Sequence, residues 1–258
     1  ALTPGIANSQ STMQDVGGNK GEQYGAVVSH GSRGQDSTLT LDGMRFNNSF
    51  NLGGGGQRFY NPNSATVSEV AVETSGMSAE VNTGGVAMNS VPKDGGNIFS
   101  VYFNGGGTNE HLQARNLTEP LAARGLKVIG HSKTIWDFGG GVGGPIKRDR
   151  LWFFGGARNW GSSEYASDVF WNKTQGVRIG APGSGVSLYS PDPDRQGNNY
   201  YPFRDYSLRL TYQATSKHKF TVSDSNQRAC MCRYRLETGV SAPEGITDWW
   251  FSPNFLTM

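Results

Sequence analysis

The sequence predicts a mostly β protein whose longer part consists of antiparallel strands in the wall of a membrane β-barrel. Residues 143–160, GGPIKRDRLWFFGGARNW, place a short charged turn between two segments in which apolar residues alternate with small or polar ones. Short charged turns at one end of the strands and long polar connections at the other favour a barrel wall. In lipid every backbone group must pair with a neighbouring strand, and a closed barrel meets that requirement.

Composition and charge exclude several classes of protein. Of the 258 residues, 35% are hydrophobic and 37 are Gly, which is unlike a helical enzyme and ordinary for Gly-rich β structure. The net charge of +2, with basic residues spread along the chain, argues against a nucleic-acid partner. No Ser/His/Asp triad or pair of carboxylates can be assembled, so no enzyme is predicted.

The two ends of the chain predict a fragment of a longer protein. The sequence begins at Ala1 without a charged and apolar leader, and no run reaches the roughly 18 apolar residues of a membrane helix. We expect an internal piece that carries too few strands to close a barrel.

Residues 1–95 differ from the remainder, with short β-like runs, few aromatic residues and many Gly, Asn and Ser. Residues 38–43, TLTLDG, predict a short strand that ends in an Asp-Gly turn. Residues 67–75 predict a second short strand, and residues 77–81 are expected to add one helical turn. This part is therefore predicted to be a small mixed domain.

Residues 96–258 predict longer strands joined by wider loops. The five expected strands lie near residues 98–104, 133–143, 151–160, 205–214 and 219–226. In the fourth, Tyr206, Leu208, Leu210 and Tyr212 share one face, and polar residues share the other. Aromatic residues at both ends of an apolar face are typical of a lipid-facing strand.

The fifth expected strand fits this pattern less well. Its apolar face begins with Phe220 and Val222 but continues with Asp224 and Asn226. Either the strand leaves the bilayer early, or its register differs from the alternation assumed here.

Two segments carry a resemblance to a known family. Residues 40–48, TLDGMRFNN, followed by residues 67–97, resemble the second half of the plug domain of TonB-dependent outer-membrane receptors. Residues 143–156 are similar to the first barrel strands of the Oar-like subgroup of these receptors. The resemblance implies that residues 1–95 form a partial plug and residues 96–258 the N-terminal portion of a barrel of about 22 strands.

The resemblance also implies a function. A protein of this kind lies in the outer membrane of a Gram-negative cell, in contact with its lipid, and binds and actively imports a ligand, here unidentified. Its energy would come from the TonB complex as a partner, through a TonB box that this chain does not contain. The alternatives are a structural or adhesive outer-membrane barrel without transport, and a secreted soluble carbohydrate-binding module.

A ligand site is predicted in the polar loop at residues 44–64. Its side chains offer hydrogen-bond donors and one aromatic face, as a polar ligand requires. The candidate residues are Arg45, Asn47, Asn48, Arg58, Tyr60 and Asn61. An equally simple interpretation is that these residues hydrogen-bond the inner wall of the barrel.

No cofactor and no metal site is predicted. The four His, at positions 30, 111, 131 and 218, show no ligand spacing. Residues 190–199 contain Asp192 and Asp194 but lack the Glu of a calcium loop, so we expect a surface turn. Cys230 and Cys232 are expected to be solvent-facing loop cysteines, paired if at all with a partner outside this chain, with a soft-metal site as the alternative.

Two further features have competing interpretations. Gly53 to Gly56 are not followed by the Lys-Ser/Thr of a phosphate-binding loop, so the tract is expected to provide backbone freedom. Trp249, Trp250 and Phe251 are expected to form part of an aromatic girdle at a membrane interface, with a sugar-stacking platform as the alternative.

Overall fold

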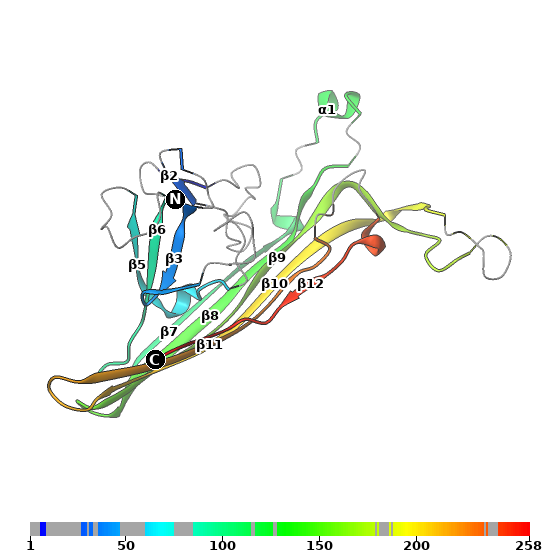
Figure 1. The fold of residues 1–258 in the computed structure, drawn as a ribbon. Helices are drawn as coiled ribbons and strands as arrows, with labels where there is room; N and C mark the ends of the chain where they lie inside the picture. The colour runs from blue at the N-terminus through cyan, green and yellow to red at the C-terminus, as the bar shows by residue number, and fades with distance from the viewer. Residues whose placement is uncertain are drawn as a thin grey trace.

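The computed structural model describes residues 6–8, 27–29, 31–32, 36–46, 60–74, 85–114, 117–125, 128–178, 180, 186, 188–234, 236 and 242–258. Within them, a large sheet of long strands lies beside a small four-stranded sheet (Figure 1). A third, two-stranded sheet pairs β1 (Ile6–Asn8) with β2 (Val27–Ser29). The prediction of a mostly β protein is confirmed.

The large sheet has seven strands in the order β12-β11-β10-β9-β8-β7, and β13 also pairs with β11. Every pair of neighbours in it is antiparallel. The strands are β7 (Ser100–Asn109), β8 (His131–Lys147), β9 (Leu151–Asn172), β10 (Pro191–Gln213), β11 (Lys219–Met231), β12 (Trp249–Phe251) and β13 (Asn254–Thr257). The five strands expected from alternation are therefore present and follow one another as a meander.

The two tight turns expected from the sequence are also present. Arg150 N donates to Lys147 O between β8 and β9, and the turn between β10 and β11 contains a bond from His218 N to Thr215 O. Both turns lie at the same end of the sheet (Figure 1). The opposite end carries the longer connections, including η5 (Glu110–Leu112) and α1 (Glu119–Ala123) between β7 and β8.

The strands are longer than alternation alone predicts, and β10 differs most. The expected surface turn at residues 190–199 is wrong, because β10 begins at Pro191. Residues 191–200, PDPDRQGNNY, have no apolar period that would mark a strand, yet their backbone pairs with the far end of β9 through two register shifts. Backbone hydrogen bonds to a long neighbour, which do not depend on side-chain pattern, extend the strand here.

The small sheet has the order β4-β3-β6-β5. It contains β3 (Thr38–Leu41), β4 (Met44–Arg45), β5 (Val67–Glu73) and β6 (Ala87–Pro92). The strands expected near residues 38–43 and 67–75 are confirmed, and the Asp-Gly turn joins β3 to β4 with both residues at positive φ. The sequence missed β6, which pairs parallel with β3 and antiparallel with β5. The helical turn expected at residues 77–81 lies outside the described residues.

The two faces of the large sheet differ in chemistry. The inner face, toward the small sheet, carries buried polar groups that include Arg158, Asp205 and Gln227. The outer face exposes large apolar side chains over most of the strands. These are Val101 and Phe103 in β7, Phe138, Val142 and Ile146 in β8, Tyr206, Leu208, Leu210 and Tyr212 in β10, Phe220 and Val222 in β11, and Leu256 in β13.

The register of β11 resolves the poor fit seen in its sequence. Leu210 lies opposite Val222, and Leu208 lies opposite Asp224. Both Asp224 and Asn226 are exposed on the outer face, as the alternation required. The assumed register is therefore correct, and polar side chains follow the apolar ones along the outer face of β11.

A glycine allows the small sheet to approach the large one. The short helix η4 (Ser64–Thr66) leads into β5 and contacts β8 and β9. A Cβ atom at Gly156 of β9 would lie 2.3 Å from Thr66 Cγ2. At the neighbouring Gly155, on the other face, the nearest atoms to such a Cβ lie 3.8 Å away. Of these two glycines, Gly156 is therefore the one that leaves the space occupied by η4.

We expect Gly156→Ala to lower the free energy of unfolding by about 1–3 kcal/mol, as overpacked sites generally do. Thr66 cannot turn away freely, because its Oγ1 donates to Asn63 O at 2.9 Å. Gly155→Ala is the matched control and is expected to have a much smaller effect. Urea unfolding of the purified variants measures both, and equal losses would show that the contact with η4 is not what Gly156 provides.

Candidate functional site

The inner face of the large sheet holds the segment before β5 through buried hydrogen bonds. Tyr60 Oη donates to Ser225 Oγ at 2.9 Å, and Ser225 Oγ donates to Asp205 Oδ2 at 2.8 Å. Asn63 Nδ2 donates to Asp205 Oδ1 at 3.0 Å. Both oxygens of the fully buried Asp205 carboxyl group therefore accept hydrogen bonds, and one of the donors, Asn63, comes from the segment that Asp205 holds.

A second pair of bonds joins the same two parts of the chain. Asn61 N donates to Gln227 Oε1 at 3.0 Å, and Gln227 Nε2 donates to Asn61 O at 2.8 Å. Gln227 is fully buried, so water cannot hydrogen-bond its side-chain amide, and this reciprocal pair of bonds supplies the missing partners. The geometry positions residues 60–63 directly against β10 and β11.

An ion network joins the two sheets nearer the tight turns. Arg209 of β10 binds Asp42 of the β3–β4 turn, with Nη1 to Oδ2 at 2.8 Å, and Asp94, with Nε to Oδ1 at 2.6 Å. Lys219 Nζ lies 3.4 Å from Asp94 Oδ2, and Thr211 Oγ1 donates to Asp94 Oδ1 at 3.1 Å. Asp94 lies in the connection between β6 and β7, so one guanidinium group holds two separate parts of the chain.

This ion network lowers the pKa of Asp94. Partial burial opposes ionisation, but the hydrogen bond and the charge of Arg209, together with Lys219 and Thr211, outweigh it and hold the pKa below its ordinary value of 3.8. Ionised Asp94 therefore stabilises the folded protein at pH values above 3.8. This contribution is lost as the pH falls below 3.8 toward the lower pKa of the folded state.

We expect Asp94→Asn to be less stable than the wild type at neutral pH, and the difference to disappear in acid below 3.8. Unfolding curves measured over a pH series test this expectation. In an Arg209→Gln background the effect of Asp94→Asn should be much reduced, because the main partner of the carboxylate is gone. If the two proteins differed in stability by the same amount at all pH values, the effect of Asp94→Asn would not come from ionisation of Asp94.

A small apolar cluster also lies on the inner face. Trp160 stacks on Phe203, with ring centroids 5.2 Å apart, and both rings are buried with Ala229. The guanidinium group of Arg158 lies 4.6 Å from the centre of the Trp160 ring. Arg158 also donates twice to Asp137, from Nε at 2.8 Å and from Nη2 at 2.6 Å. These contacts fix the inner face where β8, β9 and β10 run side by side.

The predicted ligand-binding residues separate into two groups. Tyr60 and Asn61 are buried and hydrogen-bond the large sheet, which is the alternative that the sequence left open for them. Arg45 lies in β4 with an exposed side chain. Asn47, Asn48 and Arg58 lie outside the described residues.

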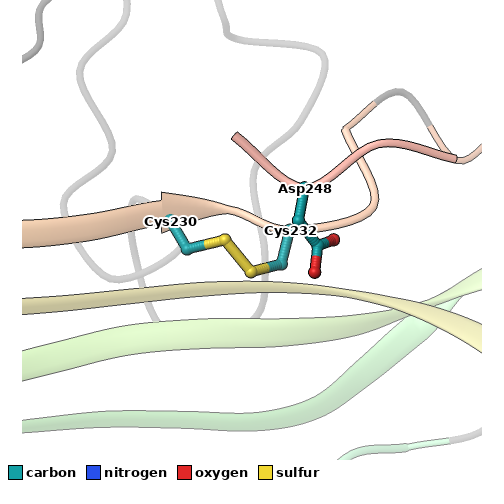
Figure 2. Close-up of side chains that lie close together, drawn as sticks. All are labelled: Cys230, Cys232 and Asp248. Atoms are coloured by element: carbon teal, nitrogen blue, oxygen red, sulfur yellow. A yellow bond between two sulfur atoms is a disulfide. The ribbon is translucent and has the colours of Figure 1, made fainter. Parts of the chain in front are cut away.

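The two cysteines differ from the sequence-based expectation. Cys230 belongs to β11, Cys232 forms a β-bridge with Tyr200, and both side chains are buried. They form a disulfide with each other. The expectation of solvent-facing loop cysteines is wrong, because β11 continues past residue 226 by pairing with β10 and β12. Asp248, immediately before β12, brings its carboxylate to this disulfide (Figure 2).

The aromatic residues near the end of the chain form β12. Trp249 and Trp250 remain exposed, and Trp249 stacks on Tyr234 with ring centroids 4.8 Å apart. Phe251 instead packs against the buried cluster of Trp160, Phe203 and Ala229. Only the two Trp side chains are therefore accessible to a membrane interface or a sugar.

A cavity of about 270 Å³ lies near the end of the large sheet that carries the long connections. Its lining combines aliphatic side chains with Glu110, Gln113, His131 and Gln196. His131 Nε2 lies 3.7 Å from Glu110, and Gln196 already donates to two backbone carbonyls. The volume is slightly below the usual range of small-molecule pockets, about 300–1,000 Å³.

No family model, curated protein or solved structure matches this chain. Among the described residues, no helix is long and apolar enough to cross a membrane.

Proposed function

We propose that this chain is part of a TonB-dependent outer-membrane receptor of the Oar-like subgroup, which binds and actively imports a ligand. In this proposal the small sheet belongs to a plug domain, and β7–β13 belong to the wall of a transmembrane barrel. The observation that carries the proposal is the distribution of side chains over the large sheet. Its exposed face carries large apolar side chains over most of the strands, whereas its covered face holds buried polar groups and an ion network.

That distribution is the reverse of what water requires. A soluble sheet packs its apolar face on a core and exposes the polar face, and an apolar surface as extensive as this outer face marks a contact with another apolar medium. Lipid provides such a medium without requiring a partner sheet, and none covers this face among the described residues. The soluble carbohydrate-binding alternative leaves the outer face unexplained.

The length of the apolar face suits a bilayer. In β8 it extends from Trp136 to Ile146, ten residue steps that measure about 33 Å along a strand. At a tilt of about 45° this spans about 23 Å, close to the apolar band of about 25 Å in outer-membrane barrels. Trp136 stacks on Tyr200 with ring centroids 5.8 Å apart, which fits an aromatic belt at one interface.

The contacts on the inner face support the assignment of a plug. A domain enclosed by a barrel must satisfy its polar groups against the inner wall, and residues 60–63 do so against Asp205, Ser225 and Gln227. We therefore assign Tyr60 and Asn61 to holding the plug. Arg45, Asn47, Asn48 and Arg58 remain the proposed ligand contacts. Energy coupling by the TonB complex rests on the resemblance of the sequence alone.

Ligand uptake by cells that make the full-length protein tests the proposal. Arg45→Ala combined with Arg58→Ala is expected to reduce uptake at unchanged outer-membrane abundance, because Arg45 is an exposed residue of β4 and substitutions of exposed residues usually change stability little. Arg124→Ala, at the end of α1, is the control and should leave both quantities unchanged. Unchanged uptake in the double variant would remove these two residues from the ligand site. If deletion of the whole protein left uptake unchanged, a structural or adhesive barrel would be favoured.

A further inference from the structure

Cys230 and Cys232 are brought together by the backbone as well as by their disulfide. Residues two apart in a strand point to the same side, so the two sulfur atoms face one another. Cys230 lies opposite Trp250 in the β11–β12 pair. Cys232 exchanges both backbone hydrogen bonds with Tyr200, at 3.0 and 3.1 Å. Neighbouring strands therefore hold each cysteine, and opening the disulfide leaves the two thiols side by side.

Asp248 supplies a third donor atom at the same place. One carboxylate oxygen and the two sulfur atoms all lie within 4.8 Å of one another. Asp248 directly precedes β12, and its Oδ1 accepts a bond from Arg233 N at 2.7 Å. Figure 2 shows the carboxylate beside Cys232, on the segment that leads into β12. The pairing of β12 with β11 therefore positions both the Asp248 carboxylate and Cys230.

The spacing of the two cysteines suits a metal ion once the disulfide is open. A tetrahedral ion with metal–sulfur distances of about 2.3 Å separates its two sulfur ligands by about 3.8 Å. The Cα atoms of Cys230 and Cys232 are 5.2 Å apart, so rotation about the side-chain bonds reaches this separation without movement of the strand. The two thiolates match the preference of Zn²⁺ and Cd²⁺ for soft sulfur ligands, and Zn²⁺ also binds carboxylate oxygen.

We propose that Cys230, Cys232 and Asp248 form a binding site for a thiophilic divalent metal ion, which the disulfide closes and reduction opens. A dithiol gives two electrons and two protons to the disulfide and becomes a cyclic disulfide itself, leaving two protein thiols. The metal ion then displaces both thiol protons and binds two thiolates and one carboxylate oxygen. Asp248 is exposed and the cysteines are buried, so the ion enters from the side of Asp248. The fourth coordination position is left to water.

Cadmium titration of the protein purified in detergent tests the proposal. The protein is reduced with a phosphine, which does not compete as a thiol ligand, and excess reductant is removed. We expect reduced wild type to bind one Cd²⁺ per chain with an ultraviolet cadmium–thiolate absorption band, and the oxidised protein to show no band. The fluorescence of Trp249 and Trp250, which adjoin the site, should change in the same titration.

Substitutions identify the ligands. Cys232→Ser should abolish the cadmium–thiolate band of a two-sulfur site. Asp248→Asn should weaken Cd²⁺ binding by about tenfold or more, because loss of a residue that only hydrogen-bonds a metal ligand already lowers metal affinity by that factor. Asn retains the oxygen that accepts from Arg233 N, so the loop is preserved. Asp194→Asn, at another exposed carboxylate, is the control and should bind as wild type does.

Two results would overturn the proposal. Reduced wild type that binds Cd²⁺ no more tightly than a Cys230→Ser, Cys232→Ser double variant would exclude the thiol pair. Unchanged affinity in Asp248→Asn would exclude the three-ligand site. If the Ser variants fail to fold, alkylation of the reduced wild-type thiols provides the same comparison in folded protein, and retained Cd²⁺ binding after alkylation would contradict the proposal equally.

Discussion

Leu210→Arg is expected to lower the free energy of unfolding by about 2–4 kcal/mol when the full-length protein is folded into lipid vesicles. Leu210 lies on the outer face of β10, between the exposed Leu208 and Tyr212. An arginine there would place a charge near the middle of the apolar band. In water the same change would cost little, because Leu210 is already 38% exposed. The size of the loss therefore distinguishes lipid from water at this face.

Asn226→Arg is the matched control for this prediction. Asn226 lies on the same outer face, opposite Tyr206, in the adjacent strand β11. Its neighbours along that face are Asp224 and Arg228, which are also exposed and polar, so a charge there is expected to cost no more than about 1 kcal/mol, as it does near an interface. Small and equal effects of both substitutions would contradict the placement of this face in lipid.

Arg209 cannot serve as a second control. From alternation alone it is an inner-face residue that Leu would replace at small cost. The structure gives its guanidinium group two carboxylate partners, Asp42 and Asp94. Arg209→Leu would remove both ion pairs. Its effect would therefore combine the placement of an apolar side chain on the inner face with the loss of the ion network.

Asn63→Ala is expected to lower the free energy of unfolding by about 2–4 kcal/mol. The side chain makes two buried bonds, from Nδ2 to Asp205 Oδ1 at 3.0 Å and from Ala65 N to its Oδ1 at 3.0 Å. Loss of the first leaves a buried carboxyl oxygen without that donor, which costs about 1–3 kcal/mol. Loss of the second removes the N-cap of η4, which costs about 0.5–2 kcal/mol.

Ser64→Ala provides the control, because Ser64 follows directly in η4 and is exposed. Urea unfolding measures both variants, and limited proteolysis of residues 60–66 reports whether the segment leaves the large sheet. We expect Asn63→Ala alone to make this segment accessible to protease. Equal stability of the two variants would show that the bond to Asp205 does not hold the small sheet in place.

Local features of the sequence were sufficient to predict the long strands. Alternation over residues 151–160 and 205–214, and the charged turn at residues 147–150, act between neighbours along the chain, and β8–β11 follow them. The first half of β10 and all of β6 could not be predicted in the same way. They are strands because backbone groups of a distant segment pair with them, and backbone pairing leaves no period in the side chains.

The sequence by itself determined the strand periodicity, the tight turns and the apolar face of β10, because each depends on residues only a few positions apart. Tertiary structure alone decided that Tyr60 and Asn61 bind the large sheet, that Arg209 joins Asp42 to Asp94, and that Asp248 lies beside the two cysteines. These partners are far apart in the chain. Their pairing depends on how two sheets stack and how β12 returns to β11, which no local pattern of residues encodes.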